Sequence, residues 1–316
     1  MRGVILDLAS MEDLDLAPIK QHLSALDTHL ITEPHQVADR IKGYELVITN
    51  KVVLDQTLIA GAEKLKLICV IATGTDVVDK NAAHARDIPV CNAVAYGVAA
   101  VAQHALSLML ALHTHLLAYH QAVLQGRWEQ AAQFCFLDYP IREMSGRTLG
   151  IIGYGHLGQA VADLAQAFGM RVLVAERLNS KTCRPDRVWL DDLLAQADVL
   201  SLHCPLTPEN QHFINAERLA LMKPGSFLIN TARGALVDEQ AVADALVCGH
   251  LAGVATDVLE TEPSRGDSPL RKLRHPNLIV TPHIAWGSVE ARQRIIEQTA
   301  ENIEAFLQGR SLRVVN

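Results

Sequence analysis

The stretch GIIGYGHLGQAVADLAQAFGMRVLVAER, residues 150–177, has the pattern of a strand, a glycine-rich turn, a helix and a second strand. A short apolar run ends at Ile152, and from Leu157 to Phe168 apolar residues recur at helical spacing. A glycine follows the last of them, where helices commonly end. Residues 171–175 are apolar again and have the length of a buried strand. The stretch therefore predicts a strand, a helix and a second strand in close succession.

Three glycines in the turn, Gly153, Gly155 and Gly158, fit the pattern G-x-G-x-x-G. In such turns one glycine permits the sharp bend, one lets a pyrophosphate approach the backbone, and one lets the helix pack on the strand. The helix N-terminus offers N–H groups and a partial positive charge to that pyrophosphate. Glu176, 18 positions after the last glycine, ends the second strand and is suited to a ribose diol. The stretch predicts a dinucleotide site; the alternative is a tight turn whose glycines serve packing alone.

Length and composition indicate a two-domain protein without a basic excess of charge. The chain has 316 residues, more than a usual single domain, and 49% of them are hydrophobic, enough for two cores. A net charge of −7 without a long basic run argues against nucleic-acid binding. The start MRGVILDLAS lacks a signal-peptide cleavage site, and the six cysteines form no C-x-x-C pair. We expect reduced thiols in a cytoplasmic protein, with neither a zinc site nor a disulfide framework.

An apolar segment, residues 98–117, approaches the length of a membrane span. Polar residues interrupt it, and no positive flank anchors it, so we expect a long helix buried between two domains. Its histidines lack carboxylate neighbours at metal-ligand spacing, so no metal site is predicted. The histidines concerned are His104, His113 and His115, together with His120 just beyond the segment.

Two series of alternating strands and helices predict two parallel sheets. The first series has the strand-like runs GVILDL, HLIT, ELVITN, LKLICVIA and IPVCNA, with a helical stretch near Ile19–Leu26. The second begins at Leu149 with TLGIIG, RVLVAE, VLSLHC, SFLINT, GVATDV and LIVTPH. A helical pattern then runs from Val289 to Leu307, and the remaining SLRVV is too short for a domain. We predict a discontinuous domain, residues 1–99 plus 289–316, and a dinucleotide-binding domain, residues 100–288.

Polar residues follow consecutive strands of the second series, where ligands of open parallel sheets bind. The strand ends read HCPLT, NTARG, TDVLETEP and TPHIAW. We therefore expect Arg233, Asp257, Glu262 and His283 to face one crevice.

These residue types suit proton transfer coupled to hydride transfer. A carboxylate such as Glu262 beside His283 stabilises the imidazolium form, which makes the pair an acid/base unit. The guanidinium of Arg233 offers a rigid fork for a substrate carboxylate. Each residue also has a plain alternative: His283 as a helix-capping core residue, Arg233 in a surface ion pair, and Glu262 as a solvated loop acid.

The chain resembles the D-isomer-specific 2-hydroxyacid dehydrogenases along nearly its whole length. The resemblance lies in GYGHLGQAVADLAQAFGMRV, CPLTPENQHFIN, LMKPGSFLINTARGALVDEQAVADAL, ATDVLETEP and HPNLIVTPHIAWGSVEAR. It implies catalytic roles for Arg233, Glu262 and His283. It implies that Asp257 binds the nicotinamide carboxamide, and that the backbone of ATGTD holds the substrate carboxylate at Thr73 and Gly74.

The resemblance also implies a Rossmann-type NAD-binding domain, a flavodoxin-like substrate domain and a homodimer. The dimer would be joined through the stretch between Asp87 and Arg127, which contains no Asp, Glu, Lys or Arg. VLVAER, VAQH and PHIAWGS look most like the glycerate dehydrogenase/hydroxypyruvate reductase group, which implies hydroxypyruvate and glyoxylate as substrates. Gln103 stands where many members have glutamate, and ATGTD replaces the more frequent GxGxD. The expected NAD site comprises Gly153, Gly155, His156, Leu157, Gly158, Glu176, Cys204, Pro205, Thr207, Thr231, Ala232 and Asp257, with Cys204 as a packing residue and not a nucleophile.

Several alternatives stay open within and outside this family. Glu176 would repel a 2′-phosphate and favour NAD, although Arg177 offsets it in part. The same chemistry on a pyruvate-like acid or on phosphohydroxypyruvate remains possible, but IATGTD supplies no cation for a phosphate. A formate dehydrogenase would have glutamine in place of Glu262. An NAD(H)-sensing co-repressor resembles the same fold, but the chain lacks appended low-complexity tails.

Overall fold

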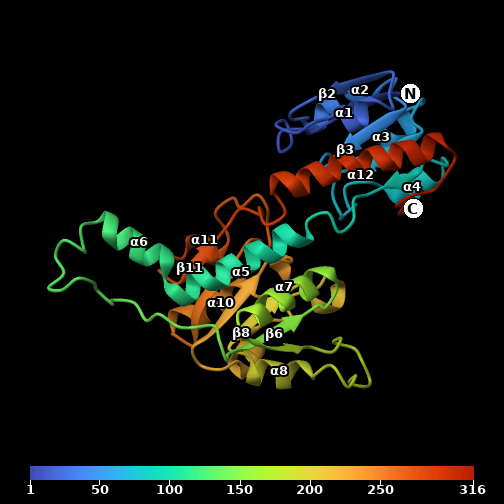
Figure 1. Cartoon of the computed structure of the whole chain (residues 1–316). Helices are drawn as coiled ribbons and strands as arrows, with labels where there is room; N and C mark the ends of the chain where they lie inside the picture. The colour runs from blue at the N-terminus through green and yellow to red at the C-terminus, as the bar shows by residue number, and fades with distance from the viewer. The chain divides into compact units, whose positions relative to one another are not determined.

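The computed structural model describes residues 1–316 and divides into two compact units. The first unit comprises Met1–Gly97 and Gly287–Asn316, and the second comprises Val98–Trp286 (Figure 1). Each is an α/β unit built on its own parallel sheet, as the sequence predicts.

The first unit has a five-stranded sheet in the order β2-β1-β3-β4-β5. This is the strand order of flavodoxin-like folds, so the predicted fold class is confirmed. All of its pairs are parallel, and the central strands are fully buried. The strands are β1 Arg2–Ile5, β2 Ala25–Thr28, β3 Leu46–Thr49, β4 Leu67–Val70 and β5 Val90–Cys91, and the helices are α1 Ala17–Lys20, α2 Val37–Ile41, α3 Gln56–Gly61, α4 Lys80–His84 and α12 Val289–Leu307.

The end of the chain belongs to this first unit. Helix α12 (red in Figure 1) packs against α1 and β4 and buries one apolar face, including Ile295, Ile296 and Ile303. Beyond it, Val314 forms an antiparallel bridge with Cys91 at the sheet edge. These contacts explain why a tail too short for a core of its own is nevertheless ordered.

Two local predictions in the first unit are wrong. HLIT, residues 29–32, is not a strand, and the helix expected near Ile19–Leu26 is only the four-residue α1. The strand lies instead at Ala25–Thr28, paired with β1. β2 is an edge strand whose one neighbour is β1, so a strand with several polar side chains can form there. No strand of the sheet pairs with the apolar run HLIT, which is therefore irregular.

The second unit has a six-stranded parallel sheet in the order β11-β10-β9-β8-β6-β7. A single parallel bridge from Ala175 to Val188 adds one more pairing beyond β7, which completes the Rossmann-type order. The strands are β6 Thr148–Ile152, β7 Arg171–Val174, β8 Val199–Leu202, β9 Ser226–Asn230, β10 Leu251–Thr256 and β11 Leu278–Val280, and the helices are α5 Val98–Thr114, α6 Leu116–Leu124, α7 His156–Ala167, α8 Leu190–Gln196, α9 Ala216–Leu221, α10 Glu239–Val247 and α11 Pro269–Lys272.

Helices cover both faces of this second sheet. Helices α5 and α7 pack together over one face, around Met109, Val161 and Ile229. The other core contains residues of α8, α9 and α10. The chain changes faces between β6 and β8, and ligands of such sheets bind at the carboxyl ends of the strands at this point.

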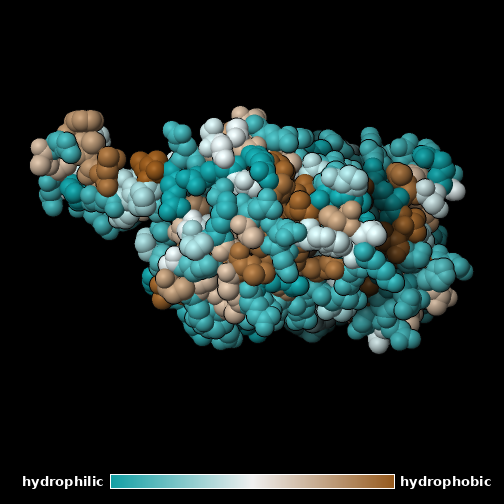
Figure 2. Space-filling view, turned by 90° about the horizontal axis from the view of Figure 1, so that it is seen from below, coloured by the Kyte–Doolittle hydropathy of each residue, from teal (hydrophilic) through white to brown (hydrophobic).

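The apolar segment forms two helices and not the single buried one that we expected. Helix α5 ends at Thr114 because His115 adopts a left-handed conformation (φ 49°), and α6 begins at Leu116. Helix α6 and the loop after it project from the second unit in Figure 1, and Figure 2 shows apolar residues on the same projection at the left. Only Ala122 of α6 is buried. None of the helices has both the length and the apolarity that a membrane span requires.

Candidate active site

The glycine-rich turn has the geometry of a pyrophosphate cradle. Gly153 adopts φ +93°, and a Cβ there would lie 2.5 Å from the backbone nitrogen of Cys204. A Cβ on Gly158 would lie 2.1 Å from the carbonyl oxygen of Gly153. Glycine at 153 thus lets the turn pack on the loop after β8, and glycine at 158 lets α7 pack on the turn. At Gly155, the N-cap of α7, a Cβ would meet nothing within 4 Å. The turn is therefore tightly packed below and open in front of the helix N-terminus, which fits a bound pyrophosphate.

Glu176 follows β7, as predicted, but its carboxylate is covered. Arg184 binds it with two parallel hydrogen bonds, Nε to Oε2 at 2.8 Å and Nη2 to Oε1 at 2.7 Å. The backbone N–H groups of Arg177 and Arg184 donate to the same two oxygens. The guanidinium and these amides hold the pKa of Glu176 well below its usual range. The side chain is only 3% exposed, so the acid expected at the ribose diol is enclosed by Arg184, which the sequence did not indicate.

The other residues expected in the NAD site lie at neighbouring strand ends of the second unit. His156 and Leu157 begin α7, while Thr231 and Ala232 follow β9. The Thr231 hydroxyl is buried without a hydrogen-bond partner, which fits a site that receives a polar ligand. Cys204, Pro205 and Thr207 follow β8. Burial raises the pKa of the Cys204 thiol to about 11, so it stays neutral at physiological pH and is a poor nucleophile.

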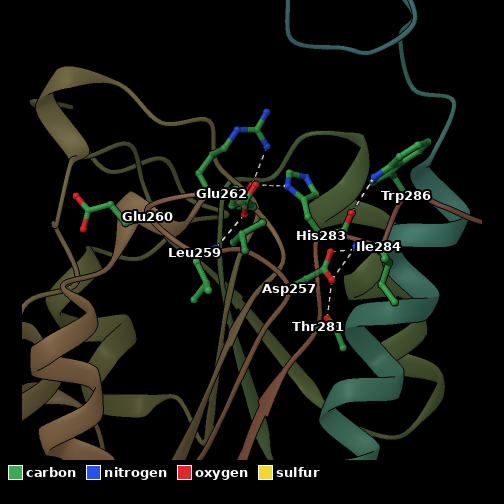
Figure 3. A network of polar contacts seen from close by, with 12 residues as sticks. Asp257, Leu259, Glu260, Glu262, Thr281, His283, Ile284 and Trp286 are labelled. Atoms are coloured by element: carbon green, nitrogen blue, oxygen red, sulfur yellow. Dashed lines mark hydrogen bonds and ion pairs between the residues drawn. The ribbon is translucent and has the colours of Figure 1, made fainter. Parts of the chain in front are cut away.

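His283 and Glu262 form a hydrogen-bonded pair (Figure 3). Nδ1 of His283 lies 2.6 Å from Oε2 of Glu262, and the backbone N–H of Leu259 donates to the other carboxylate oxygen at 2.9 Å. His283 follows β11 in a left-handed conformation (φ 55°), and its side chain is 35% exposed. With Nδ1 directed to the carboxylate, Nε2 points to the opposite side of the ring. One ring nitrogen of His283 is therefore bonded to Glu262, and the other is available for proton exchange.

Asp257, at the end of β10, holds the loop that carries His283 (Figure 3). One of its carboxylate oxygens accepts from the hydroxyl of Thr281 at 2.5 Å and the N–H of Ile284 at 3.0 Å. The other accepts from the N–H of Ala285 at 2.8 Å. The Asp257 carbonyl also accepts from the His283 N–H at 2.7 Å. Asp257 is only 1% exposed, so the structure gives it a positioning role that the sequence did not predict.

His104 belongs to the same polar cluster, although the sequence indicated no partner for it. Its Nε2 lies 3.1 Å from the Thr281 hydroxyl and 3.6 Å from Asp257. Helix α5 and strand β10 are far apart in the chain, so no local spacing signals this contact. A cavity of about 600 Å³ in the second unit is lined by Asp257, Glu262 and His283, among others.

Arg233 lies at the carboxyl end of β9 in a turn shaped by Asn230. The Asn230 side chain donates to the Arg233 carbonyl at 2.9 Å and accepts from the Ala232 N–H at 3.0 Å. A Cβ on Gly234 would lie 1.9 Å from the backbone of Leu259, so the loop after β9 packs closely on the loop after β10. The Arg233 side chain itself is exposed.

Thr73 and Gly74, predicted to hold the substrate carboxylate, lie in the first unit. They follow β4 in an exposed loop, and the Thr73 carbonyl accepts from the Asn92 side chain at 2.9 Å. They thus occupy the carboxyl end of their own parallel sheet, where ligands bind in such folds.

Comparison with known proteins agrees with this geometry. Residues 106–285, within the second unit, match the family model described as D-isomer specific 2-hydroxyacid dehydrogenase, NAD binding domain. A hydroxypyruvate reductase of Blautia hydrogenotrophica is 41% identical over 295 residues, 92% of this chain and 90% of that protein. A glycerate dehydrogenase of Methylorubrum extorquens is 44% identical over 282 residues, 89% of this chain and 88% of that protein.

A solved structure, the TT0316 protein from Thermus thermophilus, is 35% identical and superimposes with a TM-score of 0.85 over 98% of each chain. The second unit is thus an NAD-binding domain, as its glycine turn and strand order predict. The chain belongs to the D-isomer-specific 2-hydroxyacid dehydrogenases and is an NAD-dependent oxidoreductase.

Proposed function

We propose that this protein reduces hydroxypyruvate to D-glycerate with NADH, and glyoxylate to glycolate as a secondary reaction. The observation that carries the chemistry is the hydrogen bond of 2.6 Å between His283 and Glu262 at the strand ends of an NAD-binding domain. The substrate assignment is supported by the relatives, which are named a hydroxypyruvate reductase and a glycerate dehydrogenase.

His283 is the proton donor in this scheme. Glu262 accepts the hydrogen bond from Nδ1 and orients the ring, and Nε2 delivers its proton to the carbonyl oxygen of the 2-oxo acid. In the oxidative direction the neutral ring takes the proton back from the hydroxyl. NADH, when bound, supplies the hydride.

Arg233 binds the substrate carboxylate and stabilises the charge that develops on the carbonyl oxygen, because a guanidinium donates a planar fork of N–H groups. Thr73 and Gly74, in the loop after β4, are also assigned to the substrate carboxylate, through their backbone N–H groups. We assign the first unit as the substrate domain on this basis. Asp257 holds the His283 loop and is the residue assigned to the nicotinamide carboxamide.

The adenosine and pyrophosphate of the cofactor are assigned to the second unit. Gly153, Gly155 and Gly158 form the cradle, with His156 and Leu157 as the first residues of α7. Glu176 lies at the ribose end, and the loops after β8 and β9 line the crevice with Cys204, Pro205, Thr207, Thr231 and Ala232.

The experiment is NADH oxidation measured with hydroxypyruvate, glyoxylate, pyruvate, 2-oxoisocaproate and 3-phosphohydroxypyruvate. We expect the highest kcat/KM with hydroxypyruvate and a product of the D configuration. If pyruvate or the branched acid exceeds hydroxypyruvate by tenfold, about 1.4 kcal/mol, the substrate assignment is wrong and the reaction class stands. If none of the five is reduced, the enzymatic function fails and a cofactor-sensing role replaces it.

The assembly that we propose is a homodimer. Helix α6 and the loop after it carry many exposed apolar side chains, a surface that a monomer seldom leaves uncovered. These are Leu116, Leu117, Leu124, Trp128, Phe134, Leu137 and Ile141. Light scattering after size-exclusion chromatography tests this, and a monomeric mass at micromolar concentration would exclude it.

The location that we propose is the cytoplasm. All six cysteines are free thiols, which supports this location.

A further inference from the structure

Arg184 and Glu176 form a bidentate ion pair at the proposed adenosine end of the cofactor site. The carboxylate accepts four hydrogen bonds, two from the guanidinium and two from backbone N–H groups. Such a bidentate pair is strong and fixed in orientation. The two side chains differ in exposure, because Glu176 is 3% exposed while Arg184 is 49% exposed. A ligand that approaches this end of the site therefore meets the guanidinium and not the carboxylate.

This arrangement removes both reasons why an acid at this position favours NADH. A ribose diol gains affinity when a carboxylate accepts from its hydroxyls, but both oxygens of Glu176 already have donors. A 2′-phosphate is excluded when the carboxylate charge is unpaired, but here that charge is neutralised by Arg184.

The guanidinium also retains donors for a phosphate. Arginine has five N–H groups, and Arg184 directs one on Nε and one on Nη2 to Glu176, which leaves three for a ligand. Exposed Arg177 and Lys181 lie in the same loop, so between Glu176 and Arg187 the chain has four cations and two carboxylates. The local charge is positive, as the binding of a phosphate monoester requires.

We infer that Arg184 is a specificity-determining residue that admits a 2′-phosphate at the adenosine ribose, so that this enzyme binds NADPH as well as NADH. The inference rests on the NAD site of the second unit. It differs from the expectation based on Glu176 alone, because that expectation treats the carboxylate as free.

The test is the equilibrium binding of NADH and of NADPH to the whole protein, measured by isothermal titration calorimetry without substrate. We expect the two Kd values of the unmodified protein to differ by less than about tenfold. The affinity for NADPH should also decrease more steeply with salt than that for NADH, because the additional contact is ionic. A Kd for NADPH that is tenfold or more above that for NADH overturns the inference. If NADH itself does not bind, the cofactor site is wrong and the inference falls with it.

Arg184→Ala identifies the residue responsible. It removes the fork and exposes the charge of Glu176, so the ratio of the Kd for NADPH to that for NADH should rise at least tenfold. Arg171→Ala, an exposed arginine at the opposite end of β7, is the matched control and should leave the ratio unchanged. A ratio unaffected by Arg184→Ala, or raised equally by Arg171→Ala, overturns the assignment to Arg184. If Arg184→Ala does not fold, Arg184→Lys is measured in its place. Lysine retains the charge but not the planar set of N–H groups, so the ratio of the Kd for NADPH to that for NADH should still rise about threefold.

Discussion

Nδ1 of His283 lies 2.6 Å from a carboxylate oxygen of Glu262, and the Leu259 N–H holds the other oxygen of that carboxylate in place. The two side chains come from the loops after β10 and β11, neighbouring strands whose carboxyl ends meet at one edge of the sheet. The parallel topology therefore converts residues 21 positions apart into an acid/base pair.

Glu262→Gln tests this pair. The carboxylate accepts from Nδ1 and holds the ring of His283 in place, whereas a glutamine amide is a neutral and weaker acceptor. We expect kcat/KM for hydroxypyruvate to fall about 100-fold, while the Kd for NADH is unchanged. Glu260→Gln, two residues away and bonded to His212, is the control and should keep the kcat/KM of the unmodified enzyme. An unchanged kcat/KM in Glu262→Gln would refute the pairing.

Arg233→Lys tests whether the guanidinium of Arg233 binds the substrate carboxylate. Lysine keeps the charge but cannot present two parallel N–H groups, so kcat/KM should fall about 100-fold, roughly 3 kcal/mol. NADH binding measured by calorimetry should be unaffected, because the residue is assigned to the substrate. Arg310→Lys, whose side chain binds Gln308 on the surface of the first unit, should behave like the unmodified enzyme. A loss of less than threefold would remove Arg233 from the mechanism.

Asp257→Asn tests the positioning of the His283 loop. An amide at this buried position directs an NH₂ group toward the N–H groups of Ile284 or Ala285, which leaves a donor unsatisfied. We expect a loss of about 1–3 kcal/mol in stability together with a reduced kcat. Thermal unfolding and steady-state kinetics measure the two effects. Asp244→Asn, exposed on α10, is the control, and equal behaviour of the two variants would contradict this role.

Gly155→Ala tests the pyrophosphate cradle. Its Cβ would meet no protein atom within 4 Å, and Gly155 has a negative φ (−79°), so the variant should fold with an unchanged Tm. If the pyrophosphate occupies the space in front of α7, the added methyl group should raise the Kd for NADH at least about tenfold. Gly61→Ala, also without neighbours around the new Cβ, is the control. Unchanged NADH affinity in Gly155→Ala would place the pyrophosphate elsewhere.

The burial of His203 makes the free energy of unfolding depend on pH. It follows β8, bonds Ser201 through Nε2 at 2.8 Å, and has a buried Nδ1 without a partner. Burial lowers its pKa to about 4 from 6.5, so between these values the unfolded chain takes up a proton that the folded protein does not. Stability from this residue is present above pH 6.5 and decreases as pH falls toward 4, by up to roughly 3 kcal/mol.

Urea unfolding at pH 7 and at pH 4.5 measures this effect. His203→Gln should lose part of the decrease in stability between the two pH values, because glutamine has no proton to take up. His22→Gln, a surface histidine of the first unit, is the control. The same pH dependence in His203→Gln as in the unmodified protein would show that His203 does not titrate in this way.

Much of the fold could be predicted because its signals are local. The turn around Gly153, the helix that starts at His156 and the strands of the second sheet each follow from spacings within a dozen residues. The predictions fail where the structure of a segment depends on contacts with residues distant in the sequence, or on an unusual backbone conformation. The edge strand Ala25–Thr28 is recognisable only through its pairing with β1, and the break at His115 depends on a left-handed residue that is not glycine.

The parallel sheets, the dinucleotide turn and the meeting of His283 with Glu262 could be inferred from the sequence, because neighbouring parallel strands end at one edge of the sheet. Which further side chains complete these groups depends on the folded chain. His104 reaches Asp257 from a helix 153 residues away, and Arg184 encloses Glu176 through the fold of an irregular loop. Neither contact has a periodicity or spacing to reveal it, because rotamer choice and burial depend on how the whole chain packs.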